Sequence, residues 1–454
     1  MKGDTVVDKH PRQGTEKPTR AEEHRQTGNL KLRWSWVEPV IWSEKMLTAL
    51  ENGVKGGKWF SLIDKVYSKK ALEKAWLKVK KNRGAAGVDN ISIERFAKNQ
   101  DKYLEELERE LREGTYKPFP VKRVYIDKEP GKKRPLGIPV VKDRIAQQAA
   151  KMALEPILEN EFLDMSYGFR PNRGAKDALR EVDKLLKSGY TWVVDVDLAA
   201  YFDTIPHDKL MIKLERYVSD RKFLKLIEKW LDQNIMEEGK EWKPTEGTPQ
   251  GAVISPLLAN LYLHDLDTLI TNLGIKMVRY ADDFVILTDS EQKAKAVLEI
   301  IQKWSQENGL TVHPDKTHIG NFLIANQGFD FLGYRFENGS RWIRKKSIMK
   351  FRDKIRERTK RTCGKSMNMV IAKLNPILKG WYNYFKHVNK WTLETFDAFV
   401  RRRLRSILRS HNQKSKGTGR YFNDHMKWPN KYFANLGLFS MENARRLEIA
   451  CQSR

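Results

Sequence analysis

Two adjacent acids, Asp282 and Asp283, lie between two apolar runs in the sequence Tyr-Ala-Asp-Asp at residues 280–283. The flanking residues 274–279 and 284–288 favour β-strands, and the short connection between them predicts a hairpin with the carboxylates at its tip. Carboxylates are costly near apolar groups unless they are paired or bind a cation. A divalent metal would resolve that conflict, although Asp-Asp turns are also common on protein surfaces.

A third acid, Asp197, ends another strand-like run. Residues 191–198 alternate so that Asp195 and Asp197 share one face of the predicted strand and apolar side chains occupy the other. Phosphoryl transfer between nucleotides needs charge neutralised on the attacking and leaving oxygens, which two Mg²⁺ ions about 3.5–4 Å apart supply. Mg²⁺ prefers carboxylate oxygens, phosphates and water. We therefore expect Asp197 and Asp282 to hold Mg²⁺, with Asp283 contributing less directly. The alternative for Asp197 is a solvent-facing acid on a half-buried strand.

Two further segments carry residues suited to a nucleotide. The aromatic pair at 201–202, which includes Phe202, either packs against a nucleotide sugar or belongs to the core. Residues 246–260 contain a Pro-Gln-Gly sequence centred on Gln250, where glycine lets the backbone approach a ligand closely. Ser255, followed by proline, then predicts the N-cap of a helix.

Composition limits the partners of the chain. Its 454 residues suit roughly three domains, and 40% hydrophobic residues are ample for packed cores. A net charge of +27 indicates a polyanionic partner, with nucleic acid favoured over an anionic membrane surface. No apolar run approaches the ~20 residues of a membrane-spanning helix. Two cysteines exclude a disulfide framework and a Cys-x-x-Cys zinc module, and favour a reducing, cytoplasmic compartment.

The remaining segments predict how these residues are positioned. Residues 1–31 are expected to be a disordered leader, residues 34–66 to form short helices that dock on a larger body, and residues 413–427 to form a loop. A basic hairpin is expected over residues 121–139, with strands at 121–126 and 134–139. Helices are expected at 72–79, 93–112, 143–162, 347–361, 369–385 and 395–410, with a glycine-punctuated loop at 82–89.

In the order of these segments, from about Leu72 to Phe439, the chain resembles the reverse transcriptases encoded by bacterial group II introns, the intron-encoded maturases. The resemblance implies an α+β right-hand polymerase, with fingers, a palm built on an antiparallel sheet, and a helical thumb or maturase domain. The implied divisions are a partly disordered leader at 1–70, fingers at 71–190, palm at 191–340, thumb at 341–440 and a tail at 441–454.

The resemblance also implies roles for single residues. Segment 280–283 is similar to the polymerase box of the family, with Asp197 as its partner metal ligand. Phe202 is similar to the steric gate that excludes a ribose 2′-hydroxyl, and Gln250 lies in the segment beneath the incoming nucleotide. Basic side chains, Lys128 and Arg134, would hold the triphosphate. Lys316 either meets the departing pyrophosphate or is an ordinary surface lysine.

Contacts with RNA and primer are implied outside the palm. Arg83 lies in a segment similar to the lid over template RNA, and Gly333 lies in one similar to the hairpin that grips the primer. In the thumb, Trp381 and Tyr384 beside Arg401 and Arg402 suit unstacked bases and an RNA backbone. The alternative is a helical bundle with a solvated basic face, in which Trp381 belongs to the core.

Together these features predict an RNA-directed DNA polymerase that binds intron RNA, assists its splicing and reverse transcribes it during retrohoming. The expected cofactors are two Mg²⁺ ions, and the expected partners are intron RNA, RNA template with DNA primer, dNTPs and a DNA target. The protein is expected in the cytoplasm, where it can associate with the nucleoid, and not in a membrane. Two alternatives stay open: a splicing maturase without polymerase activity, and a reverse transcriptase that works in defence or repair.

Overall fold

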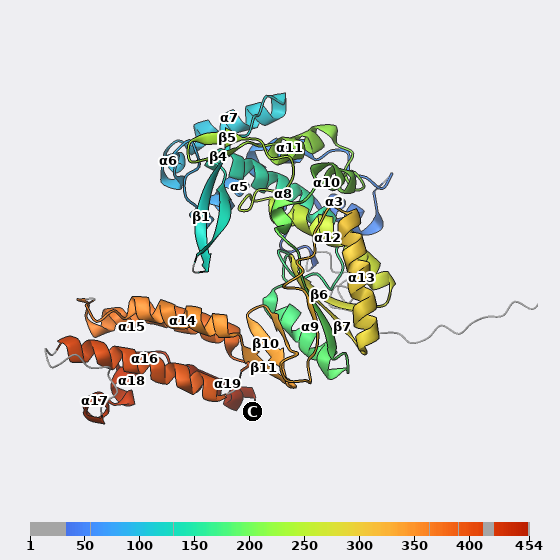
Figure 1. The fold of residues 1–454 in the computed structure, drawn as a ribbon. Coiled ribbons are helices and arrows are strands. Elements are labelled where there is room, and N and C mark those ends of the chain that lie inside the picture. The colour runs from blue at the N-terminus through green and yellow to red at the C-terminus, as the bar shows by residue number, and fades with distance from the viewer. Residues whose placement is uncertain are drawn as a thin grey trace, which may run out of the picture.

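The computed structural model describes residues 33–54, 56–129, 131–362, 364–388, 390–411 and 422–452. The leader expected at residues 1–31 lies outside them. Three antiparallel or mixed sheets alternate with helices along the described chain. Figure 1 shows a sheet near the middle, a helix-rich layer with the hairpin of β1 (Val121–Glu129) and β2 (Lys132–Ile138) at one end, and a group of long helices at the other.

Short N-terminal helices dock on a long central helix, as the sequence predicts. α3 (Glu44–Asn52) and α4 (Ile63–Tyr67) lie against α8 (Val141–Glu161). The indole nitrogen of Trp42 donates to the carbonyl oxygen of Met152 at 3.1 Å. Trp42 is fully enclosed, so this segment belongs to the core of the described molecule.

The helix expected at 93–112 is two helices. α6 (Ile93–Lys98) ends at Asn99, whose φ of −129° and ψ of 30° leave the helical region, and α7 (Gln100–Glu113) follows at once. Its neighbour α5 (Lys69–Asn82) extends beyond the expected 72–79, because the Ser68 hydroxyl caps its first turn by accepting from the Ala71 amide.

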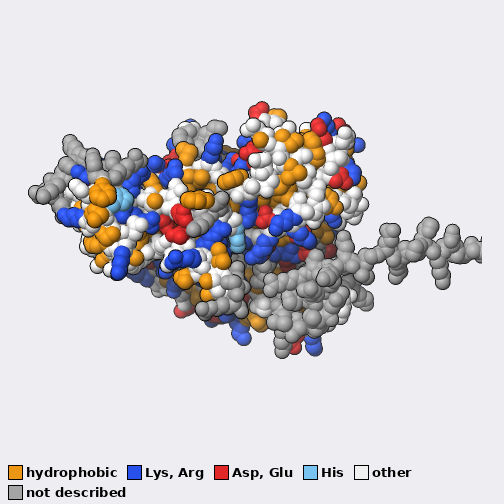
Figure 2. Space-filling view, turned by 90° about the horizontal axis from the view of Figure 1, so that it is seen from below, with side chains coloured by type: hydrophobic (Ala, Val, Ile, Leu, Met, Phe, Trp, Pro, Cys, Tyr) orange, Lys and Arg blue, Asp and Glu red, His pale blue; other side chains and the backbone are white. Residues whose placement is uncertain are grey.

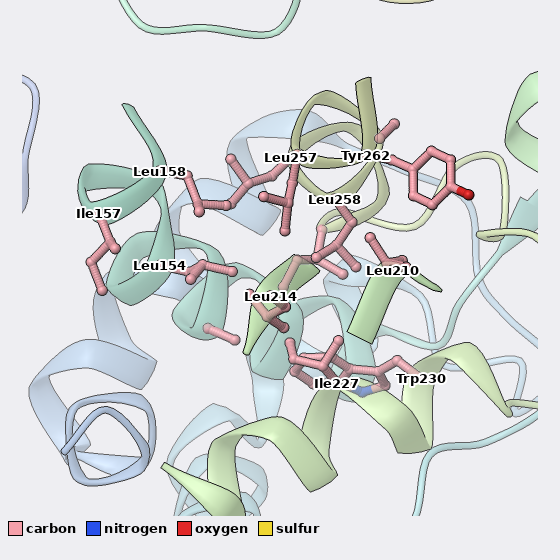
Figure 3. Close-up of a cluster of buried hydrophobic side chains, with 14 of the residues drawn as sticks. Leu154, Ile157, Leu158, Leu210, Leu214, Ile227, Trp230, Leu257, Leu258 and Tyr262 are labelled. Carbon is pink, nitrogen blue, oxygen red and sulfur yellow. The ribbon is translucent and has the colours of Figure 1, made fainter. Parts of the chain in front are cut away.

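A cluster of apolar side chains joins four helices (Figure 3). α8 meets α10 (His207–Leu214), α11 (Arg221–Leu231) and α12 (Ser255–Asn272) there. The side chains that meet are Leu154, Ile157 and Leu158 from α8, Leu210 and Leu214 from α10, Ile227 and Trp230 from α11, and Leu257, Leu258 and Tyr262 from α12. α12 starts one residue earlier than predicted, because Ser255 is already helical and its hydroxyl donates to the Pro249 carbonyl.

The predicted basic hairpin is present and extends into a larger sheet. β1 (Val121–Glu129) pairs antiparallel with β2 (Lys132–Ile138), and the register shifts between Asp127 and Glu129. β1 also pairs in parallel with β4 (Ile235–Glu237), which pairs with β5 (Lys240–Trp242). Residues 235–242, expected with the palm, thus belong to the sheet of this hairpin.

The central sheet has the order β6-β7-β3-β8 and is antiparallel, as expected for the palm. Its strands are β6 (Lys276–Tyr280), β7 (Asp283–Thr288), β3 (Trp192–Asp197) and β8 (His318–Asn321). Both faces are covered: Val194 and Ile286 enter one core, whereas Val193 and Leu287 enter the other. α13 (Glu291–Glu307) packs against β3 and β7, and α9 (Ala175–Lys187) packs against β6.

A small sheet leads from the central sheet into the C-terminal helices. It consists of β9 (Phe329–Phe331), β10 (Tyr334–Glu337) and β11 (Ser340–Ile343). The helices are α14 (Lys345–Arg358), α15 (Met367–Phe385), α16 (Lys390–His411), α17 (Phe422–Lys427), α18 (Asn430–Asn435) and α19 (Met441–Gln452). The three long helices expected after residue 336 are therefore confirmed. None of the described helices has the length and apolar content needed to cross a membrane.

Two C-terminal segments differ from the sequence expectation. Residues 422–427, expected as loop, form α17. Residues 441–452, expected as a tail, form α19, which packs against α16. Asp397 of α16, 4% exposed, accepts from the Ser440 hydroxyl at 2.7 Å and from the Met441 amide at 3.1 Å, so a buried carboxylate caps the start of α19.

Candidate active site

The strand pairing brings together acids that lie far apart in the sequence. Asp197, at the end of β3, stands directly opposite Asp283, the first residue of β7. Asp282 precedes Asp283 in the tight β6–β7 turn, where Ala281 has a φ of 62°. Alternate residues of a strand share a face, so Asp195 also stands on the side of Asp197 and Asp283. The predicted hairpin with acids at its tip is confirmed.

The electrostatics of the site show mutual repulsion among these acids. Burial, followed by the charges of Asp195, Asp282 and Asp197, raises the pKa of Asp283 to about 8. Burial and the charge of Asp330 raise the pKa of Asp195 to about 7. A bound cation would relieve this repulsion. Sequence reasoning assigned no role to Asp195 or Asp330, although the alternation of residues 191–198 already placed Asp195 beside Asp197.

Basic side chains offset part of this negative charge. The Lys316 ammonium lies 3.2 Å from a carboxylate oxygen of Asp197. Arg344 Nε lies 2.8 Å from a carboxylate oxygen of Asp330. The backbone amide of Asp197 donates to the Thr317 hydroxyl at 3.3 Å, which helps to hold this loop against the end of β3. Of the two interpretations of Lys316, its position beside Asp197 favours a role in the site.

The donor set fits Mg²⁺ as it is usually bound at phosphate-transfer sites. Among the described residues, no group of three or more His, Cys, Asp or Glu side chains is arranged to hold a metal ion. Mg²⁺ usually takes only one or two carboxylates from the protein and completes its shell with substrate phosphates and water. Asp197 and Asp282 suffice for that mode of binding, and they are oxygen ligands in a region of excess negative charge.

A buried network of hydrogen bonds holds the backbone of the acidic turn in place. Arg279, fully buried at the end of β6, donates through Nε to Asp267 at 2.7 Å and also contacts it through its second amino group. Its remaining amino group donates to the Ala281 carbonyl and the Asn260 side chain, each at 3.0 Å. Asn260 in turn donates to the Gly168 carbonyl at 2.8 Å. Sequence reasoning did not identify this network, since nothing in the strand pattern distinguishes Arg279 from an exposed arginine.

Gln250 connects the basic hairpin to the segment after β3. Its side-chain oxygen accepts from Arg134 Nε at 2.8 Å, and its amide nitrogen donates to Asp203 at 3.0 Å. Asp203 ends the short 3₁₀ turn η1 (Tyr201–Asp203) and was not singled out from the sequence. Phe202, in the same turn, is 8% exposed. The structure therefore brings Arg134 and Gln250 together, and the Phe202 carbonyl accepts from the Thr248 amide of the same loop at 2.6 Å. The side chain of Lys128 lies outside the described part of the chain.

The backbone at Gly251 lies close to β2 of the protein, whereas the sequence suggested a close approach to a ligand. Its φ is +107°, and a Cβ there would lie 2.3 Å from the Gly137 carbonyl oxygen of β2. The Gly137 amide donates to the Gln250 carbonyl at 2.6 Å. The loop at 249–251 is thereby fixed against the hairpin.

The residues expected to contact RNA and primer have different surroundings. Arg83 is exposed at the C-terminal end of α5, in a left-handed conformation with φ of 49°. Gly333 lies between β9 and β10, and its carbonyl oxygen accepts from the Ser347 hydroxyl at 3.1 Å. Neither arrangement tests a contact with nucleic acid.

The aromatic residues of α15 pack largely within the helical region. The Trp381 ring lies 4.5 Å from Phe351 and 4.7 Å from Phe396, measured between centroids. The Tyr384 hydroxyl donates to the Leu332 carbonyl at 2.8 Å, which joins α15 to the β9–β10 turn. These contacts favour the core interpretation of Trp381 over base stacking.

The arginines of α16 divide into partly exposed and buried side chains. Arg401 and Arg402 are partly exposed, and the Arg402 guanidinium lies 5.3 Å from the centre of the Phe399 ring. Arg405, not singled out from the sequence, is 2% exposed and donates to the Trp428 carbonyl at 2.9 Å. Arg405 therefore joins α16 to the segment after α17. Arg401 and Arg402, in contrast, keep part of their surface exposed to solvent.

Comparison with known families matches two regions of the chain. Residues 126–336 match the reverse transcriptase (RNA-dependent DNA polymerase) model, and residues 348–425 match the group II intron maturase-specific domain. Protein YkfC of Escherichia coli (strain K12) is 36% identical over 303 residues, which cover 58% of this chain and 76% of that protein. The group II intron-encoded protein LtrA of Lactococcus lactis subsp. cremoris is 35% identical over 243 residues, covering 49% of this chain and 40% of that protein.

Solved structures give a weaker match. A chain of a partial Cas6-RT-Cas1–Cas2 complex is 24% identical, with a TM-score of 0.35, covering 54% of this chain and 42% of that chain. That score is too low to support an argument about shared geometry. The sequence matches above therefore carry the comparison, and the matched region spans less than half the length of LtrA.

Proposed function

The chain belongs to the group II intron reverse transcriptases and maturases, and from that premise we propose that it extends a DNA primer on an RNA template by metal-dependent nucleotidyl transfer. The observation that carries the proposal is the pairing of Asp197 with Asp283 next to Asp282. Three acids at one sheet end, with a raised pKa at Asp283, form a site that a cation would stabilise.

The chemistry divides between the cations and the residues of the chain. Bound Mg²⁺ would neutralise charge on the attacking and leaving oxygens of the transfer. Asp197 and Asp282 would hold the ions. Asp283 would add negative charge beside them and so increase the attraction for the cations. Arg134, fixed by Gln250, would meet the triphosphate, and Phe202, which precedes Asp203 in η1, would limit the space at the sugar. These roles rest on the family resemblance, on the pairing of Asp197 with Asp283 and on the hydrogen bond between Arg134 and Gln250.

Primer extension on RNA with Mg²⁺ tests the proposal directly. Asp282→Ala should abolish extension and leave RNA binding intact, because it removes a proposed metal ligand from a turn and leaves the sheet paired. Asp289→Ala is the matched control, since Asp289 is an exposed acid just beyond the other end of β7. Extension by Asp282→Ala at the wild-type rate would refute the assignment.

We further propose that the protein binds intron RNA, assists its splicing and reverse transcribes it during retrohoming into a DNA target. The maturase-specific match at 348–425 supports this proposal, as does the excess of basic residues. Figure 2 shows one face of the molecule, on which Lys and Arg side chains are widespread. Affinity for intron RNA should fall steeply with salt, with a logarithmic slope of about −0.7 to −0.9 per phosphate contact. A complex that is insensitive to salt would contradict this proposal.

The alternatives separate in the same assays. A maturase without polymerase activity would splice an adjacent intron but fail to extend a primer. A reverse transcriptase of defence or repair would extend a primer but show no preference for intron RNA. The position of Asp197, Asp282 and Asp283 together at one sheet end favours a working polymerase, because the repulsion that raises the pKa of Asp283 would be offset by a bound cation.

A further inference from the structure

The segment between α8 and α9 presents an aromatic side chain beside the acidic turn. Phe169 lies in this segment, is 48% exposed, and has its ring centre 6.4 Å from that of Tyr280. Its backbone φ is 57°, and among the described residues no other aromatic residue has a positive φ. A bulky side chain strains the backbone in this region, so surrounding contacts must hold Phe169 there. None of the roles proposed above uses this residue.

Gly168 holds one side of Phe169 against the acidic turn. A Cβ at Gly168 would collide with the Ala281 amide nitrogen and would lie 2.9 Å from the Tyr280 carbonyl carbon, so the two stretches of backbone are in contact. The Gly168 carbonyl oxygen accepts from the Asn260 side chain at 2.8 Å, within the buried network that holds the turn. The position of Phe169 is therefore tied to the backbone that carries the acids.

A buried arginine holds the other side of Phe169. Arg170 is 7% exposed and donates through Nε and one amino group to the Glu159 carboxylate, at 2.9 and 2.8 Å. Its amino groups also donate to the carbonyl oxygens of Phe162, at 3.2 Å, and Ser166, at 2.8 Å. These bonds fold the preceding segment around Arg170. Phe169 thus keeps its strained backbone through its neighbours, while its own ring stays partly exposed.

The segment of Phe169 lies along the outer edge of the central sheet. β6 is the last strand of that sheet and pairs with β7 along one edge. On its other edge, the Arg279 carbonyl accepts from the Tyr167 amide at 2.8 Å, and the Arg279 amide donates to the Met165 carbonyl at 2.9 Å. Phe169 therefore approaches the acidic turn from the side of β6 that faces away from β7 and β3.

Tyr280 connects Phe169 to the acids across the sheet. Tyr280 of β6 stands opposite Asp283 of β7, and Asp283 stands opposite Asp197 of β3, so the three side chains share one face. The proposed sugar contact, Phe202, follows β3 at the other end of this row. A substrate that reaches Phe169 must therefore extend from the acids in the direction away from the incoming nucleotide. In primer extension that substrate is the primer.

We propose that the ring of Phe169, together with Tyr280, holds the 3′-terminal nucleotide of the primer in position for attack. The assignment rests on the proposed function and adds to it a residue that places the reacting end. Every nucleotide offers an apolar sugar and a π-face, so an aromatic ring can pack against any primer end. The effect falls on the rate of transfer more than on affinity, because a small misplacement of reacting atoms is costly.

The rate of one nucleotide addition tests the proposal. Phe169→Ala should slow single-turnover extension at saturating dNTP at least about fivefold, the loss expected for one aromatic contact with a base. The Kd for primer–template should change little, and Phe169→Tyr should keep most of the rate because the ring remains. Phe60→Ala is the matched control and should extend like the wild type, since Phe60 is a 75% exposed phenylalanine that precedes α4.

The strained backbone separates a role in the reaction from a purely structural role. Asparagine and glycine tolerate a positive φ better than alanine does. Phe169→Asn and Phe169→Gly should therefore melt at a higher temperature than Phe169→Ala. All three variants lack the ring, so all three should extend equally slowly. If Phe169 only stabilised its loop, the extension rates would instead follow the order of the melting temperatures.

A fluorescent base at the primer end gives a readout that needs no catalysis. 2-Aminopurine is placed at the 3′ terminus of the primer, and the complex with protein and RNA template is measured without dNTP. Emission should be higher with Phe169→Ala than with the wild type, because the terminal base loses its packing. The same probe several nucleotides upstream should give equal emission with both proteins.

This measurement also distinguishes the two levels of the assignment. A wild type that never extends a primer but shows the 2-aminopurine difference would contradict the proposed function and leave Phe169 at the primer end. Equal rates for Phe169→Ala and Phe60→Ala, or equal emission from the terminal probe with wild type and Phe169→Ala, would overturn the role of Phe169. A higher KM for dNTP with an unchanged maximal rate would also overturn it, because the ring would then contact the incoming nucleotide.

Discussion

The ammonium group of Lys316 lies 3.2 Å from a carboxylate oxygen of Asp197. The two residues are 119 positions apart in the sequence. The His313 amide and the Thr317 hydroxyl also bond to the backbone of Asp197, so the loop that carries Lys316 is tied to the end of β3. Lys316 is therefore placed to balance a charge that changes at this carboxylate or at a phosphate next to it.

Lys316→Ala should slow single-turnover primer extension by about a hundredfold or more, the range expected when a group that stabilises developing charge is lost. Lys316→Arg should keep part of the rate, since the charge remains but its shape changes. The measurement is the rate of one nucleotide addition at saturating dNTP.

Lys293→Ala provides the control for this effect. Lys293 pairs with Asp289 at 2.7 Å on the surface. Its loss therefore removes a similar Lys–Asp pair that does not involve Asp197, Asp282 or Asp283. If Lys316→Ala and Lys293→Ala slowed extension equally, Lys316 would have no specific role in the candidate active site.

Arg279 should prove essential for the stability of the acidic turn. It forms a fully buried pair with Asp267, and loss of one partner leaves an uncompensated charge that costs about 3–5 kcal/mol. Arg279→Met should lower the free energy of unfolding by that amount, as measured by urea denaturation. The double variant Arg279→Met with Asp267→Leu should recover most of the stability, because no buried charge remains.

The double variant Arg279→Met with Asp267→Leu should regain its free energy of unfolding but not its rate of primer extension. The double variant still lacks the donors that hold the Ala281 carbonyl and the Asn260 side chain. Primer extension should therefore stay low even where unfolding is restored to the wild-type value. Full recovery of extension in the double variant would show that Arg279 does not position the turn.

The sequence predicts the acidic hairpin and its partner strand because both follow local rules. Alternation placed Asp195 and Asp197 on one face, and two apolar runs around a tight turn placed Asp282 at a tip. The meeting of Asp197 with the hairpin depends on strand order, which no local pattern reports. It was expected because a Mg²⁺ site needs carboxylates from separate strands, and the family resemblance implied the same pair. The long C-terminal helices followed from their period in the same way.

Other parts of the site depend on contacts that no local pattern reports. The bonds of Gln250 to Arg134 and Asp203 join three segments, and each residue alone resembles an exposed polar side chain. Trp381 carries the same signal whether it stacks on a base or packs against Phe351, because its helix is apolar on that side. In both cases the contacts of the side chain depend on tertiary packing, which the sequence alone does not show.

Gly251→Ala should weaken the nucleotide site through the fold of its loop. A Cβ at this φ of +107° would meet the Gly137 carbonyl oxygen at 2.3 Å, so β2 and the loop must separate. Because Arg134 lies on β2 and bonds to Gln250, the KM for dNTP should rise several-fold while RNA binding is retained. Steady-state extension over a range of dNTP concentrations measures the change.

Gly274→Ala is the control for backbone strain alone. Gly274 also has a positive φ, +68°, but a Cβ there would meet nothing within 4 Å. Each substitution should destabilise the protein by about 1 kcal/mol through its φ, and only Gly251→Ala should also change the KM. An equal KM for the two variants would show that the contact between β2 and the loop does not matter for nucleotide binding.

Asp143 of α8 should make stability depend on pH in the opposite sense to an ordinary paired carboxylate. It is fully buried and accepts from the Tyr116 hydroxyl at 2.6 Å and the Phe119 amide at 2.9 Å. Burial outweighs these bonds and raises the pKa from 3.8 to about 7. Between those values the folded protein holds a proton that the unfolded chain has released.

The contribution of this group to stability is therefore fully present below about pH 4 and is lost as the pH rises to about 7. The slope is at most about 1.4 kcal/mol per pH unit within this window. Asp143→Asn cannot titrate, so the free energy of unfolding of the wild type minus that of the variant should fall steadily from pH 4 to pH 7 and then level off. Urea denaturation of both proteins across this range measures the difference. A difference that stays constant with pH would mean that hydrogen bonds from Tyr116 and Phe119 keep the carboxylate ionised in the folded state.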